Sequence, residues 1–190
     1  PENSVYSSPY WLEEAHSTGM YTVSDKSKIG QAESQNPISV PFHLTIKDQD
    51  FTFQRDLQYA YVDPARGEIY QPFAILPKAT VRFEESVAIY PAAESKKIAL
   101  KVEAHTEKVS GNLILEAPAD WKISPQKIAV ELDRKGESKT YYFEVTAPDH
   151  PSEIDLKARL ISGDETFDTQ LTRIDYSHIP TQYVLLPSQA

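Results

Sequence analysis

Histidine offers the broadest chemistry in this sequence, as a metal ligand and as a general acid or base. The chain has five: His16, His43, His105, His150 and His178. None lies three or four residues from another, the spacing that brings two imidazoles to one helix face around a metal. Asp149 and His150 lie between two prolines, where a polar turn is the simplest interpretation. Cysteine is absent, which excludes disulfides and thiolate metal sites. The sequence therefore predicts no metal centre and no other cofactor.

Paired carboxylates are the second kind of group that could do chemistry here. Glu13 is adjacent to Glu14, and Glu84 to Glu85. Adjacent residues of a strand face opposite sides, so neither pair can act as acid and base on one bond. The sequence has no G-x-S-x-G and no glycine-rich phosphate loop, with only 6 glycines in all. We therefore expect no catalytic residues and no enzymatic activity in this chain.

The two tryptophans could bind a ligand through their ring faces. Trp11 follows Tyr10 in a polar, loop-like stretch, and two interpretations stay open: an anchor packed on the fold, or an exposed stacking platform for a sugar or partner. Tyr10 and Trp11 are thus the candidate contact residues for a glycan or partner. Trp121 lies where a β-sandwich would turn between strands, which predicts a core or core-rim aromatic. Because the other aromatics follow the strand period, we expect glycan affinity to be weak or absent.

Composition limits the partners. The chain has 190 residues and a net charge of −9, and it lacks the basic stripe of a nucleic-acid-binding protein. No apolar run reaches the roughly 18 to 20 residues of a membrane span, and the polar N-terminus has no apolar signal core. The chain begins at Pro1 rather than Met, so we expect a piece of a longer protein.

The first part of the chain predicts a small β domain after an irregular segment. Residues 1–36 are rich in Ser, Glu, Asn and Pro. Apolar residues then alternate with polar ones over 38–47 and again over 51–61, around an Asp-Gln-Asp turn, which predicts a long β-hairpin. The turn at 63–67, Asp-Pro-Ala-Arg-Gly, has residues suited to its corners. We interpret residues 59–83, with three prolines, as the seam between two domains.

From residue 79 onward, short alternating runs recur with turn signals between them. They centre on Val81, Val87, Leu100, Leu113, Val130, Phe143, Leu156 and Leu171. About seven short strands over roughly 100 residues predict an immunoglobulin-like β-sandwich, here without the cysteine pair of antibody domains. The predicted fold is therefore all-β, with two tandem domains. We expect a small β domain over 1–76, the sandwich over 77–182 and a linker over 183–190.

Several of these segments resemble known families. Residues 118–125 (PADWKISP), 136–138 (GES) and 142–148 (YFEVTAP) resemble the β-sandwich modules that accompany bacterial glycosidases. Residues 10–12, 19–21, 29–30, 63–72 and 174–182 are similar to the region that follows the catalytic domain in large bacterial PIG-L (LmbE-like) deacetylases. Together these segments span nearly the whole chain.

The resemblance implies that this chain is an accessory region covalently linked to a zinc-dependent N-acetylglucosaminyl deacetylase that is secreted, periplasmic or at the cell surface. The family's metal motif, Ala-His-Pro-Asp-Asp with a later His-x-x-His, is absent, since residues 15–18 read Ala-His-Ser-Thr. No catalytic residue therefore carries over. The leading hypothesis is a non-catalytic scaffold that holds the enzyme against a polymeric substrate. The alternatives are a carbohydrate-binding module using exposed aromatics, a cell-surface interaction module, and a hydrolase with an unfamiliar site.

Overall fold

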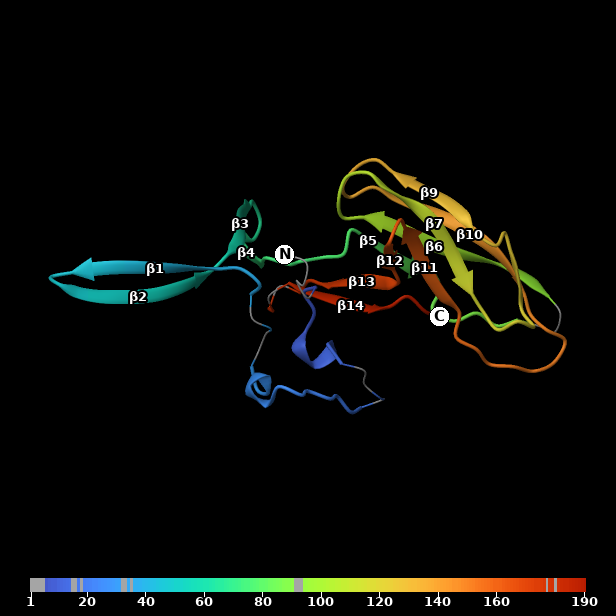
Figure 1. The fold of residues 1–190 in the computed structure, drawn as a ribbon, viewed down its shortest axis with the longest axis horizontal. Coiled ribbons are helices and arrows are strands. Elements are labelled where there is room, and N and C mark those ends of the chain that lie inside the picture. Colours follow the sequence, from blue (N-terminus) through green and yellow to red (C-terminus); the bar gives the residue numbers. More distant parts are fainter. Residues whose placement is uncertain are drawn as a thin grey trace. The chain divides into compact units, whose positions relative to one another are not determined.

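The computed structural model describes residues 6–14, 17, 19–31, 34, 36–90, 94–176, 178–179 and 181–190. The chain forms two compact units, of which unit 1 comprises Pro1–Ile75 and Thr172–Val184, and unit 2 comprises Leu76–Leu171 and Leu185–Ala190. The predicted all-β fold is confirmed, because strands dominate the described residues (Figure 1). The predicted domain limits stay a prediction; both units take a second segment from the C-terminal part of the chain.

Unit 2 is a sandwich of two antiparallel four-stranded sheets. Its strands are β5 (Ala79–Phe83), β6 (Ser95–Ala104), β7 (Val109–Glu116), β8 (Lys122–Ser124), β9 (Ile128–Leu132), β10 (Ser138–Thr146), β11 (Lys157–Ser162) and β12 (Glu165–Phe167). One sheet has the order β5-β6-β10-β8 and the other β12-β11-β7-β9. With β9 set aside and the other seven lettered A to G along the chain, these orders read ABED and GFC, as in a constant-type immunoglobulin domain. The predicted immunoglobulin-like sandwich is confirmed, with β9 as an eighth strand.

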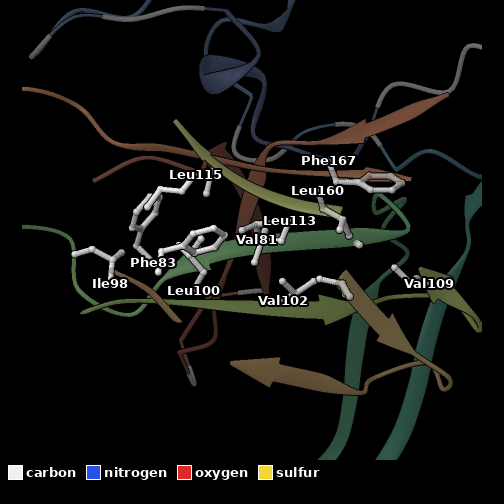
Figure 2. Packing of buried hydrophobic residues seen from close by; sticks show 14 of the residues in the cluster. Val81, Phe83, Ile98, Leu100, Val102, Val109, Leu113, Leu115, Leu160 and Phe167 are labelled. Carbon is white, nitrogen blue, oxygen red and sulfur yellow. The ribbon is translucent and has the colours of Figure 1, made fainter. Parts of the chain in front are cut away.

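The core of unit 2 follows from the alternation in its strands. Every second residue of β6 from Ile98 to Ala104 is buried, and Leu113 and Leu115 of β7 meet them from the other sheet. Figure 2 shows these side chains converging on one interior. Removing a large apolar side chain of this kind from water contributes about 1.5 to 3 kcal/mol. A shift of one residue in the pairing of β6 would expose all of its buried apolar side chains to solvent.

Unit 1 contains two hairpins. The strands β1 (Ser39–Ile46) and β2 (Gln49–Asp56) pair with each other, and β3 (Gln58–Asp63) pairs with β4 (Gly67–Pro72). The turn predicted at 63–67 is confirmed, since Asp63 Oδ1 accepts bonds from the N–H groups of Ala65 at 2.8 Å and Arg66 at 2.9 Å, and Gly67 has φ +80°. These two bonds lower the pKa of Asp63. No helix of the described residues has the length and apolar character to cross a membrane.

Two segments differ from the sequence predictions. The strand expected around Val87 is a loop in which Val87 and Ile89 are 74% and 78% exposed, so their alternation reflects no buried face. The linker expected over 183–190 instead holds most of β14 (Gln182–Pro187), which pairs with β13 (Thr169–Ile174). The end of the chain is fixed as well, because Ala190 and Leu156 exchange backbone bonds of 3.0 and 2.7 Å. A single short run of apolar residues was too weak a signal to predict this strand.

Gly111 in β7 allows a close approach of the backbone. A Cβ at this position would lie 2.3 Å from the carbonyl oxygen of Ile161 in β11. We predict that Gly111→Ala lowers the free energy of unfolding by about 3 kcal/mol, because the strand backbone must move to admit the methyl group. Urea denaturation measures the loss. The control is Ser110→Ala on the exposed face of the same strand, which should stay within about 0.5 kcal/mol; equal effects would contradict the account.

His105 should make unit 2 sensitive to acid. Its Nε2 lies 3.0 Å from Oγ1 of the buried Thr80. Burial is the main cause that holds the pKa of His105 below 6.5. The negative charge of Glu103 raises this pKa, and the positive charge of Lys135 lowers it further. The unfolded chain therefore takes up this proton first as the pH falls. We predict that stability is unaffected by His105 above pH 6.5, falls as the pH drops from there to the folded pKa, and then levels off.

The His105→Gln variant should lose this part of the acid sensitivity. Urea midpoints compared at neutral pH and near pH 5 measure it. His43→Gln on the exposed strand β1 is the matched control, and it should keep the wild-type pH dependence. A His105→Gln protein with unchanged pH dependence would show that His105 is not held neutral.

Candidate functional site

Tyr90 and Trp121 form an aromatic corner at one end of the unit 2 sandwich. Their ring centroids lie 5.2 Å apart with an interplanar angle of 89°. Both rings are half-buried and pack against the core, and a turn bond of 3.0 Å from the Trp121 N–H to the Pro118 carbonyl fixes the backbone. The prediction that Trp121 is a core or core-rim aromatic is confirmed. Lys96 Nζ lies 5.5 Å from the Tyr90 ring centroid, a distance at which a cation–π attraction acts.

The polar atoms of both rings are buried without a partner. Tyr90 Oη and Trp121 Nε1 have no hydrogen-bond partner within the described part of the chain. Burial, followed by the charge of Glu85, raises the pKa of Tyr90, so the hydroxyl stays protonated. Leaving a buried donor or acceptor unpaired costs about 1 to 3 kcal/mol. Two such atoms in neighbouring rings mark this corner as an exception that calls for an explanation, and a functional site is one.

A cavity of about 630 Å³ opens beside this corner, and we call it the Trp121 cleft. Small-molecule sites usually measure about 300 to 1,000 Å³. Residues 85–90 after β5, residues 147–156 between β10 and β11, and Trp121 between β7 and β8 line it, together with Ala190. These three connections meet at one end of an immunoglobulin-like sandwich, so the fold itself brings the segments together.

The lining of the Trp121 cleft is apolar on its walls and acidic at its polar positions. The carboxylates along it are Glu85, Asp149, Glu153 and Asp155. His150, also on the lining, is paired through Nε2 with Asp120 Oδ2 at 3.3 Å. This excess of negative charge opposes anionic ligands and tolerates neutral or cationic ones. The perpendicular rings of the aromatic corner and the exposed Ile89 give the cleft apolar walls.

Tyr10 and Trp11 lie elsewhere, in the short 3₁₀-helix η1 (Tyr10–Leu12) of unit 1. Their ring centroids are 4.9 Å apart at 87°, so the two rings do not form one flat platform. The backbone N–H of Tyr10 donates to Ser34 Oγ at 2.8 Å. Trp11 lines a cavity of only about 80 Å³, well below a usual ligand site. The structure favours the anchoring role for both rings, and their contact with a glycan stays a prediction.

The remaining histidines do not come together. His43 Nδ1 bonds Thr52 Oγ1 on the β1–β2 hairpin, and the His178 ring lies 5.8 Å from that of Tyr176. His16 lies outside the described residues. Among the residues that the structure describes, no group of three His, Cys, Asp or Glu side chains is placed to hold a metal ion.

The Trp121 cleft was not predicted from the sequence. The sequence predicts a polar turn at Asp149 and His150 and a core or core-rim aromatic at Trp121, but no local pattern joins the two. The signal that could have joined them is topological: in an ABED/GFC sandwich the connections after strands A, C and E share one end. The sequence itself matches no model of a known protein family and no curated protein.

Tyr90→Phe tests whether the hydroxyl is unpaired in the free protein. Because the variant removes a buried polar atom that has no partner among the described residues, we predict that the free energy of unfolding rises by about 1 kcal/mol. Tyr142→Phe, at a 58% exposed site on β10, should leave it unchanged. A Tyr90→Phe protein destabilised by more than 1 kcal/mol would show instead that Oη is bonded within the folded chain.

Proposed function

We propose that this chain is a non-catalytic accessory region of a secreted, periplasmic or cell-surface carbohydrate-active protein, and that unit 2 binds a neutral glycan in the Trp121 cleft. The observation that carries the proposal is the aromatic corner, whose two residues line a ligand-sized cavity and each hold a buried polar atom without a partner among the described residues. The linked catalytic domain, a PIG-L type deacetylase, is proposed from the resemblance of the sequence segments. The glycan of such a protein would be rich in N-acetylglucosamine.

Sugar chemistry fits this cleft in three respects. A pyranose ring has a C–H face that packs on aromatic and aliphatic walls, as Trp121 and Ile89 provide. Its hydroxyl and acetamido groups both donate and accept, so they can bond the Trp121 N–H and the Tyr90 hydroxyl. Since it carries no charge, the acidic lining does not repel it. The segment that resembles the glycosidase-associated modules also contains Trp121, so the resemblance and the geometry meet at the same residue.

Binding of N-acetylglucosamine oligomers, measured by calorimetry, tests the proposal. We expect a dissociation constant on the order of 0.1 mM, about −5.5 kcal/mol. Tyr90→Phe and Trp121→Phe each remove one hydrogen-bonding atom and keep a ring, so each should weaken binding about tenfold. Trp11→Phe is the matched control and should bind as the wild type does. Equal loss with Trp11→Phe, or no binding of these oligomers, would refute the glycan site.

The second candidate is a scaffold without a ligand, as the sequence first suggests. It is favoured by the closed core of unit 2, whose buried side chains form one cluster, as a rigid spacer requires. The calorimetric comparison distinguishes the two candidates, because a spacer binds no oligomer and its Tyr90 and Trp121 variants change stability alone.

A further inference from the structure

The β1–β2 hairpin of unit 1 has two faces of opposite character. On one face the cross-strand pairs are Phe42 with Phe53 and Leu44 with Phe51, flanked by Val40 and Ile46. The other face is polar, and its side chains form hydrogen bonds across the two strands. His43 Nδ1 lies 3.0 Å from Thr52 Oγ1, and Thr45 Oγ1 donates to Asp50 Oδ1 at 2.7 Å. The apolar face is therefore the one whose burial against a partner would stabilise the protein.

No described residue covers this apolar face. Figure 1 shows β1 and β2 paired only with each other, and they form a separate two-stranded sheet. The six apolar side chains of the face are 42 to 55% exposed, although the rings of Phe42 and Phe53 stack with centroids 5.1 Å apart. A lone two-stranded hairpin is marginal in water and needs a further layer on its apolar side.

The size of the face suits a protein interface. Ile38 and Leu57 extend it at the base of the hairpin, and they are 38% and 40% exposed. A large apolar side chain has roughly 200 Å² of surface, so eight of them exposed to this degree leave roughly 700 Å². The largest apolar patch of an ordinary monomer is about 300 to 600 Å², whereas one partner in a standard interface buries about 800 Å².

The face is also complementary to itself. It carries two polar residues, Arg55 opposite Val40 and Gln49 opposite Ile46, and they lie equally far from the middle of the hairpin. If two copies stack face to face about a two-fold axis with tip over base, each Arg55 meets Gln49 of the other copy. Stacking tip over tip would instead bury each Arg55 against Val40, which offers its guanidinium no hydrogen-bond acceptor.

Charge does not oppose such a contact. Residues 38–57 contain two basic residues, Lys47 and Arg55, and three acidic ones, Asp48, Asp50 and Asp56, which gives a net charge of −1 against −9 for the whole chain. We propose that the apolar face of the β1–β2 hairpin binds a second copy of this chain, as a two-fold dimer stacked tip over base. This interface is independent of the proposed glycan site, which lies in unit 2.

Sedimentation equilibrium of the whole chain gives the first test. We expect a dimer with a dissociation constant in the micromolar range or below, about the strength open to a standard-size interface. Phe53→Glu should raise the dissociation constant about a hundredfold or more, because it buries an unpaired charge. Thr52→Glu, the neighbour on the polar face, should leave it unchanged. A wild-type chain that is monomeric at 0.1 mM would overturn the proposal, because its dissociation constant would then exceed about 0.1 mM, or about −5.5 kcal/mol. A dimer whose dissociation constant does not change with Phe53→Glu would overturn it as well.

Cross-linking tests the tip-over-base arrangement. Because the chain has no native cysteine, only the introduced cysteines can react. Gln49 and Arg55 lie six residues apart on one strand, about 20 Å. In the tip-over-base dimer the two copies of either residue are therefore about 20 Å apart, too far for a bismaleimide of about 10 Å span, the spacing of stacked sheets. Gln49→Cys mixed with Arg55→Cys should give a cross-linked dimer, and neither variant alone should. Products from a single variant, or none from the mixture while the wild type is dimeric, would refute the tip-over-base arrangement.

Discussion

The face-to-face burial of the two sheets of unit 2 determines where everything else in that unit can lie. Along β6 and β10 alternate side chains are buried, and the register between these strands, with Phe143 beside Ile98 and Tyr141 beside Leu100, keeps every inward residue inward. Because side chains alternate between the two faces of a strand, a slip of even one residue would move every inward side chain to the solvent. The loops at each end of the strands therefore start from fixed points, and the Trp121 cleft is a consequence of that constraint.

The Trp121 cleft departs from the rule that buried polar atoms find partners. Trp121 packs against the core with its ring, and this packing holds Nε1 in a position without a partner among the described residues. Tyr90 does the same with its hydroxyl, at the same corner. Natural sequences break local rules chiefly at functional sites and compensate for the cost elsewhere in the fold, which supports the proposal of a binding site here. The same loops carry exposed Val87 and Ile89, which an ordinary solvent-facing turn would not favour.

The sequence predicted the strands and turns that follow from the order of a few neighbouring residues. Alternation around Leu100 and Phe143 gave strands whose inward residues are buried, and the residues of the 63–67 turn made the bonds expected of them. Alternation at Val87 was misleading because exposed loops can alternate by chance, and the segment at 183–190 had too few residues to reveal β14. The cleft depends on three connections that are far apart in sequence, so no local pattern could show it. Tyr10 and Trp11 are distinctive in sequence for their polar surroundings, and Ser34, a part of the structure that the local pattern did not indicate, holds the backbone of Tyr10.

The two tryptophan side chains allow a direct test of glycan binding in the Trp121 cleft, since Trp11 and Trp121 are the only indoles in the chain. A ¹⁵N-labelled sample gives one indole N–H signal for each, assigned with the Trp11→Phe variant and titrated with N-acetylglucosamine oligomers. We predict that the Trp121 signal shifts in a saturable way, because Nε1 gains a partner, while the Trp11 signal stays in place. A shift confined to Trp11, or two signals unmoved at millimolar oligomer, would contradict it.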